Sequence, residues 1–126
     1  KNNVLDIQIR QGLLFNYDPI ALSIIIHNLV MNANKFTANG TITVKCGIAT
    51  GWMLIEVTDT GVGMEPGVVE SLNNFRAVGS AMGTDSEGGW GLGYKVIFDL
   101  VKASQGTLEI ISSQGKGTCV KIALHE

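Results

Sequence analysis

The sequence has few cysteines, little net charge and no long apolar run, and each of these absences excludes a class of protein. Its two cysteines, Cys46 and Cys119, lie far apart and fit no metal-ligand spacing, so we interpret them as small apolar strand residues in a reducing compartment. The net charge of −2 and the lack of any basic run give no reason to expect nucleic acid as a partner. No apolar run reaches the roughly 18 to 20 residues that span a bilayer, and the residues given show no signal-peptide pattern.

The remaining composition is that of a folded domain. The chain has 126 residues, of which 45% are hydrophobic and 16% charged, enough to bury the core of a single domain over residues 1–126. No internal repeat or low-complexity linker divides it. Because the chain opens at Lys1 and a strand is predicted to begin almost at once, we expect a domain of a longer protein.

Alternating apolar residues predict the strands. In VLDIQI, for example, Leu5, Ile7 and Ile9 share one side of the strand. A turn at Thr50-Gly51 and a later Gly-Lys-Gly turn each join two strands, so two hairpins are expected. The predicted strands cover residues 4–9, 41–48, 52–59, 106–112 and 117–124, and GLLFNY, residues 12–17, is a candidate for a short additional strand.

Three helices are predicted between these strands. The first begins after Asp18, which can cap a helix and is followed by a proline, and it ends near Phe36. The other two are predicted over residues 66–75 and 91–104, and the glycine-rich segment 76–90 between them has no periodicity, so we expect a mobile loop. This order of elements predicts an α/β sandwich, with one mixed β-sheet and helices packed on one face.

Three polar residues form a line on the first predicted helix. At about 100° per residue, Asn32 lies about 40° from Asn28, and Lys35 lies about 20° to the other side. Amide oxygens suit Mg²⁺, which takes few protein ligands, and a lysine one turn further could neutralise phosphate. The alternative is a last helical turn in water, with Lys35 at the negative end of the helix dipole. His27 points about 100° away from this line and is not expected to be catalytic.

Asp59 is a carboxylate at the end of a predicted strand, on the side of Met53 and Val57, which is the expected core side. A carboxylate is costly to bury unless it meets hydrogen-bond donors, and the exocyclic amine of adenine is such a donor. In the following DTGVGM segment, Gly61 and Gly63 allow the backbone to approach a ring closely and permit positive φ. A strand-end aspartate followed by an ordinary glycine turn is the alternative interpretation.

A second glycine cluster, EGGWGLGYK at residues 87–95, precedes the last predicted helix. Free backbone N–H groups at a helix N-terminus can bind anions. Neither familiar phosphate motif fits, because the glycines give G-x-G-x-G rather than G-x-G-x-x-G, and GKGT at 115–118 lacks the helix that follows a P-loop. The cluster alone decides nothing, but with the polar line and Asp59 it completes a set of metal, phosphate and adenine contacts.

Four segments in order, NLVMNANKFT, DTGVGM, GGWGLG and GKGT, resemble the N, G1, G2 and G3 boxes of the GHKL ATPase superfamily. The chain most resembles the catalytic ATP-binding domain of sensor histidine kinases, from about Asp18 to Ala123. Four ordered boxes are far more specific than any one of them. The resemblance implies ATP and Mg²⁺ as ligands and an ATP lid at about residues 75–90.

The resemblance also implies roles for individual residues. Asn32 is the implied Mg²⁺ ligand, Asn28 a polar contact near the phosphates and Lys35 a phosphate contact. Asp59 is the implied hydrogen-bond partner of adenine. The other residues implied to shape the base pocket or to hold the nucleotide are Gly61, Gly63, Gly89, Gly91, Leu92, Gly93 and Thr118.

The chain departs from the family pattern around the lid. The usual phenylalanine-rich box is reduced to Asn74-Phe75-Arg76. Trp90 stands where a small or hydroxyl residue is more usual, and Tyr94 stands where an aliphatic residue is common. We interpret both as packing residues, with an altered lid closure as the alternative.

Three functions are compatible with these features. The resemblance implies a protein-histidine kinase domain that transfers the γ-phosphate of ATP to a histidine, for relay to a response regulator. A self-contained GHKL ATPase would carry a glutamate one helical turn before Asn32, and there the chain has Asn28, which cannot accept a proton. A pseudokinase-like module that binds nucleotide or a protein partner without transfer is the third possibility, and intact Asn32 and Asp59 count against a loss of nucleotide binding.

The phosphoacceptor is expected outside this chain. His27 lies within the predicted binding helix and His125 is next to the C-terminus, so neither is on a free helix that could dimerise. We therefore expect the acceptor histidine on an upstream dimerisation domain, in a homodimeric parent protein. The resemblance implies a cytoplasmic domain and is compatible with an inner-membrane sensor as the parent.

Overall fold

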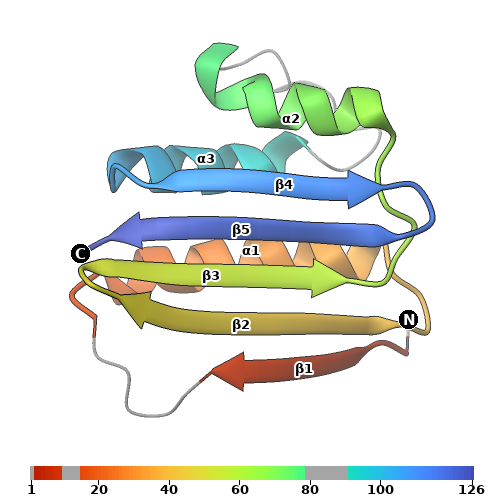
Figure 1. The fold of residues 1–126 in the computed structure, drawn as a ribbon, viewed down its shortest axis with the longest axis horizontal. Helices are drawn as coiled ribbons and strands as arrows, with labels where there is room; N and C mark the ends of the chain where they lie inside the picture. The colour runs from red at the N-terminus through yellow and green to blue at the C-terminus, as the bar shows by residue number, and fades with distance from the viewer. Residues whose placement is uncertain (1, 10–14, 79–90) are drawn as a thin grey trace.

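The computed structural model describes residues 2–9, 15–78 and 91–126, which form five strands and three helices (Figure 1). The strands are β1 (Val4–Ile9), β2 (Thr41–Ala49), β3 (Trp52–Asp59), β4 (Thr107–Ser113) and β5 (Gly117–His125). The helices are α1 (Pro19–Lys35), α2 (Pro66–Val78) and α3 (Gly91–Ala103). None of these helices is long and apolar enough to cross a membrane within the described part of the chain.

The strands form one mixed sheet with the order β1-β2-β3-β5-β4. β1 pairs with β2 in parallel, and the other neighbours pair antiparallel. Helices α1 and α3 lie behind the sheet in Figure 1 and contact each other, whereas α2 lies beyond β4 and contacts β4 and α3. This arrangement confirms the predicted α/β sandwich.

The core lies between the sheet and the helices α1 and α3. Ile55 of β3 pairs with Ile122 of β5, and each is only 1% exposed, which explains the alternation of apolar residues in these strands. On α1, Ile25, Leu29 and Ala33 recur at helical spacing and are all buried. Helix α1 is thus fixed over the sheet, and this determines where its last turn lies.

The two ends of α1 are held by side chains. At its start, the Asp18 carboxylate accepts a hydrogen bond from the backbone N–H of Ile20 at 2.9 Å, as predicted for a helix cap. At its end, the Asn3 amide donates to the Asn34 side-chain oxygen and to the Thr37 carbonyl, both at 2.8 Å. Asn34 therefore has a structural role, in joining the start of the chain to the last turn of α1.

Helix α2 extends to Val78, beyond the predicted end at residue 75. The loop predicted at 76–90 is therefore wrong for 76–78, which are helical, and its remainder, 79–90, lies outside the described residues. The ATP lid implied at about residues 75–90 stays a prediction. The Asn73 side chain exchanges two hydrogen bonds with the backbone of Ile110, each of 3.1 Å. It covers the backbone groups that the edge strand β4 would otherwise leave unpaired.

The N-terminal strand β1 covers the predicted residues 4–9, and its apolar side is not covered. Leu5 pairs with Ile42 and Ile7 with Val44, so the apolar side of β1 continues the core side of β2. None of the six residues of β1 is buried, however, because α1 packs on β2 and β3. The candidate strand at 12–17 is also not seen, since residues 15–17 form no strand and 12–14 lie outside the described residues.

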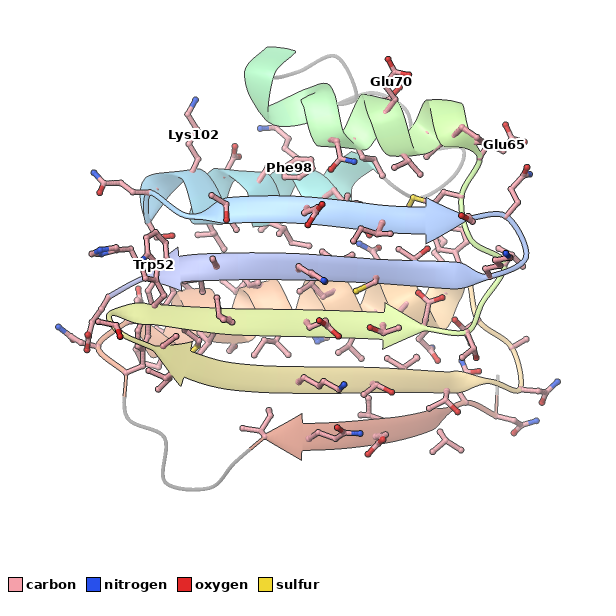
Figure 2. All side chains as sticks on the ribbon, in the orientation of Figure 1. Trp52, Glu65, Glu70, Phe98 and Lys102 are labelled. Atoms are coloured by element: carbon pink, nitrogen blue, oxygen red, sulfur yellow. The ribbon has the colours of Figure 1, made fainter. Side chains whose placement is uncertain are left out.

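Four element ends meet at one end of the sheet. Figure 1 shows on its right the last turn of α1, the end of β3, the start of β5 and the first turn of α3. Trp52, labelled in Figure 2, marks the opposite end, where β3 begins. The segments that carry the predicted site residues are therefore far apart in sequence and adjacent in space.

Candidate functional site

A small cavity lies at the end of the sheet where these elements meet. Its free space is about 10 Å³, room for about one water molecule. The lining residues are Leu29, Asn32, Ala33, Phe36, Val57, Asp59, Met64, Tyr94, Thr118 and Val120. The fold thus brings the predicted site residues Asn32, Asp59 and Thr118 together against apolar walls.

A larger hollow of about 1070 Å³ lies on the sheet and contains none of the predicted site residues. Cross-strand pairing there puts Lys45 beside Glu56, Glu56 beside Lys121, and Lys121 beside Glu109. Opposite charges face each other along this row, so they largely neutralise one another. We therefore place the candidate site at the small cavity, where buried polar atoms meet.

Asp59 is the buried acceptor of the cavity, with 7% of its surface exposed. Its Oδ1 accepts a hydrogen bond from the backbone N–H of Gly61 at 2.8 Å. Burial raises the pKa of Asp59, whereas hydrogen bonds from the backbone of Gly61 and Thr118, and the nearby Thr37 hydroxyl, lower it; burial prevails. A carboxylate has acceptor capacity beyond these contacts, so Asp59 can accept a further donor from a ligand.

The hydroxyl of Thr118 is oriented by a chain of hydrogen bonds. Ser112 Oγ accepts from the backbone N–H of Met64 at 2.8 Å and donates to the carbonyl of Gly117 at 3.0 Å. Its contact of 2.8 Å with Thr118 Oγ1 must then have Thr118 as the donor, because the single proton of Ser112 is already used. Thr118 therefore keeps acceptor lone pairs for the cavity, and Ser112 is a supporting residue that the sequence did not indicate.

The loop between β3 and α2 depends on its two glycines. Gly63 adopts a positive φ of +73°, which its lack of a side chain permits, as predicted. A Cβ atom at Gly61 would collide with the carbonyl oxygen of Phe36, and one at Gly63 with the carbonyl oxygen of Ser113. At both glycines the loop backbone therefore lies close to the backbone of another segment. These contacts hold the loop between the end of α1 and the turn after β4.

Two polar atoms at this end of the molecule are buried without a hydrogen-bond partner among the described residues. They are Asn32 Nδ2 and Thr37 Oγ1. The Thr37 hydroxyl lies close enough to Asp59 to lower the pKa of Asp59, but it completes no hydrogen bond in this structure. Buried polar groups without partners are rare in proteins and are costly, so a polar ligand or water at the cavity would satisfy Asn32, which lines it.

The polar line on α1 divides into different environments. Asn32 lines the cavity, whereas Asn28 and Lys35 do not. The Asn28 amide donates to the Ile24 carbonyl one turn earlier at 2.8 Å, and Lys35 is exposed, with its ammonium 5.7 Å from the Phe36 ring centre. Asn28 and Lys35 are therefore placed for contacts outside the cavity, on the same side of α1 as Asn32.

The second glycine cluster opens α3. Gly91, Leu92 and Gly93 form the first residues of this helix, whose first N–H groups have no acceptor within the helix. Such a helix start is of the kind that can bind an anion, and the phosphate role of these residues stays a prediction. Gly89 lies outside the described residues.

Sequence reasoning did not assign the aromatic walls of the cavity. Phe36 directly follows α1, and Tyr94, which the sequence marked only as a departure from a family pattern, is 2% exposed. Burial and the negative charge of Asp59 both raise the pKa of Tyr94 above its ordinary value, so its phenol stays protonated. Tyr94 also stacks on Phe98, with ring centres 6.0 Å apart.

Comparison with known proteins identifies the family of this chain. Residues 17–126 match the family described as histidine kinase-, DNA gyrase B-, and HSP90-like ATPase. The sensor histidine kinase YclK of Bacillus subtilis (strain 168) is 32% identical over 119 residues, which cover 94% of this chain and 25% of YclK. The autoinducer 2 sensor kinase/phosphatase LuxQ of Vibrio harveyi is 33% identical over 113 residues, covering 85% of this chain and 13% of LuxQ.

The fold matches solved structures as well. The mycobacterial sensor histidine kinase MprB aligns with a TM-score of 0.77 and 22% identity, over 98% of this chain and 82% of that structure. The chain spans a quarter or less of the two curated relatives named above. Because the family match covers most of the chain, the chain belongs to the family of histidine kinase-, gyrase B- and HSP90-like ATPases.

Proposed function

We propose that this member of the ATPase family is the catalytic domain of a histidine kinase, which binds ATP with Mg²⁺ and transfers the γ-phosphate to a histidine on another domain. The observation that carries the proposal is the meeting of Asn32, Asp59 and Thr118 in one cavity beside the first turn of α3. These residues come from three separate elements, and no structural contact accounts for the unpartnered Asn32 amide nitrogen among the described residues.

At the base end, Asp59 would accept a hydrogen bond from the exocyclic amine of adenine. The carboxylate is already fixed by the Gly61 N–H, so little ordering is needed when the base binds. Thr118 offers acceptor lone pairs on the same side of the cavity. The apolar residues around them, Leu29, Val57 and Val120 among others, suit the flat ring of a base.

At the phosphate end, Asn32 would hold Mg²⁺ through its side-chain oxygen. The residue fits this role because it lines the cavity and carries an amide oxygen, a ligand that Mg²⁺ accepts. Its Nδ2, buried without a partner among the described residues, could donate to a phosphate oxygen beside the ion. No group of three or more His, Cys, Asp or Glu side chains in the described residues could hold the ion, so water and phosphate would supply its other ligands. Bound Mg²⁺ would neutralise charge on the phosphates.

The other predicted contacts belong to the same end. Lys35 and Asn28 lie outside the cavity on the same side of α1 as Asn32, where they could meet phosphate oxygens. The backbone N–H groups of Gly91 and Gly93 at the start of α3 would donate hydrogen bonds to phosphate oxygens, and Gly89 is proposed to act with them.

The residues favour transfer over hydrolysis. A neutral imidazole already offers a lone pair, so the new N–P bond can form as the bond from the γ-phosphorus to the β–γ bridging oxygen breaks and ADP leaves. Hydrolysis would need a base for water, and Asn28, one turn before Asn32, carries an amide whose Nδ2 is already used within α1. A nucleotide-binding module without transfer is the competing proposal.

The partners follow from this proposal. The acceptor histidine would lie on an upstream dimerisation domain, the final acceptor would be a response regulator, and the parent protein would be a homodimer. We propose a cytoplasmic location for this domain, with a membrane-bound sensor as one form of the parent.

The test combines binding and transfer. ATP is titrated with and without Mg²⁺ by calorimetry, and ³²P transfer is followed after the parent protein's upstream helical region is added. Asn32→Ala should remove most of the Mg²⁺-dependent part of ATP affinity and abolish transfer, while metal-free ADP binding changes much less. His27→Ala, an exposed residue of the same helix, is the matched control. An equal loss for both nucleotides would show that Asn32 does not hold the metal, and normal binding without transfer would favour the competing proposal.

A further inference from the structure

We propose that the Tyr94 side chain occupies the base end of the cavity and must turn away before nucleotide binds, so that Tyr94 sets the affinity of the site. This inference rests on the proposed function, because it concerns the same cavity. It assigns a role to a residue that the sequence pattern suggests only as a packing choice.

The first argument is the size of the cavity. Its free space of about 10 Å³ holds about one water, whereas sites for small ligands usually measure about 300–1,000 Å³. Asp59 and Thr118 nevertheless face this space. A base can therefore reach them only if part of the wall moves.

The second argument identifies the part of the wall that can move. β3 and β5, which carry Asp59 and Thr118, are hydrogen-bonded to neighbouring strands on both sides. Met64 is held by its backbone bond to Ser112. Tyr94 is a large aromatic side chain that lines the cavity with only 2% of its surface exposed, so its ring takes up space that a base would need. It lies in the first turn of α3, where the helical backbone makes the fewest hydrogen bonds within the helix.

The third argument is the position of the phenol beside the acceptor for the base. Burial and the charge of Asp59 both act on the Tyr94 hydroxyl, which stays protonated, so a neutral hydroxyl lies within the field of Asp59. An adenine amine would use the same carboxylate. The phenol and the base therefore compete for the same buried region, and only one of them can fill it.

The size of the effect follows from a two-state description. A binding-competent minor state is typically populated at roughly 0.1–10%, and the apparent dissociation constant is raised by the inverse of that fraction. A side chain too short to reach the base position would remove this factor. Tyr94→Leu should therefore bind Mg–ATP at least about tenfold more tightly than the wild type.

The experiment compares four proteins by calorimetry with Mg–ATP. Tyr94→Leu should gain affinity, and Tyr94→Phe, which keeps the ring, should stay close to the wild type. Phe98→Leu is the matched control, because Phe98, labelled on α3 in Figure 2, packs on Tyr94 but does not line the cavity. It should lose packing without any gain in affinity. Circular dichroism and the melting temperature show that each variant is folded.

A second measurement needs no substitution. The chain has two tyrosines, so 3-fluorotyrosine labelling gives two ¹⁹F signals, and Tyr17, which does not line the cavity, serves as the internal reference. Saturating Mg–ATP should shift the Tyr94 signal toward that of free fluorotyrosine and leave Tyr17 in place. Equal ATP affinity of the folded wild type and Tyr94→Leu, or an unchanged Tyr94 signal at saturation, would overturn this inference alone. No ATP binding by any of the four proteins would overturn the proposed function itself.

Discussion

Replacement of Asp59 by asparagine tests base recognition directly, because the change keeps the shape of the side chain. In the proposed complex one carboxylate oxygen keeps the Gly61 N–H, at 2.8 Å, and the other faces the amine of adenine. Asparagine can satisfy Gly61 with its oxygen, but its NH₂ group would then face the amine, donor against donor. A mispaired buried group costs roughly 1–3 kcal/mol, which corresponds to ATP binding that is about 5- to 140-fold weaker.

The assay is calorimetric titration with ATP and with GTP, whose ring carries a carbonyl where adenine has its amine. The wild type should prefer ATP, and Asp59→Asn should lose most of that preference. Asp6→Asn, at an exposed carboxylate of β1, is the matched control and should bind like the wild type. Equal affinities of the wild type for ATP and GTP, or a folded Asp59→Asn protein with unchanged ATP affinity, would refute the assignment of Asp59 to the base.

Three further predictions concern charge, pH and stability. Burial raises the pKa of Asp59, so the folded state binds more protons than the unfolded state as pH falls toward the ordinary carboxyl value of about 4. Urea unfolding should therefore show the wild type gaining stability on acidification relative to Asp59→Asn, and a parallel pH dependence of the two proteins would contradict this. Asn28→Glu places a carboxylate one turn before Asn32, where it should repel the triphosphate, so KM for ATP should rise and phosphate transfer to the upstream region should fall. Transfer at the wild-type rate would show that Asn28 lies away from the phosphates. Asn73→Ala removes two partly buried hydrogen bonds of 3.1 Å to Ile110, so it should lower the free energy of unfolding by about 1–3 kcal/mol without changing ATP affinity. An unchanged urea midpoint would show that α2 protects the β4 edge by other contacts.

The sheet could be predicted because its signals are local. β2 and β3 were predicted to within a residue or so, from the alternation over 41–48 and 52–59 and from the turn at Thr50-Gly51. The start of α1 was predicted from Asp18-Pro19. Burial of β1 could not be predicted in the same way. Its pattern is that of a strand with one apolar side, but whether a helix covers that side depends on where α1 packs.

The polar residues of the site could also be predicted, because each has a local signature. Asp59 comes at a strand end before a glycine loop, and Asn32 is a polar residue on an otherwise apolar helix. Their supports could not be predicted, since Ser112 orients Thr118 only through contacts with Met64 and Gly117, which depend on the turn geometry. Asn34 shows the opposite case, because an amide within the same motif pairs with Asn3 and serves the fold.

The size of the cavity is a property that no single segment of the sequence contains. Asp59, Asn32 and Thr118 are placed by hydrogen-bonded strands and a packed helix, so their relative positions follow from the fold. The space between them depends on the side chains that α3 turns toward the sheet, and there one residue decides whether the volume is filled. Tyr94 fills it, because its ring is buried against Phe98 at one side and near Asp59 at the other. We therefore expect affinity at this site to depend on the side chain of Tyr94 as well as on the polar residues. The two contributions can be separated by changing the aromatic ring while leaving every polar group in place.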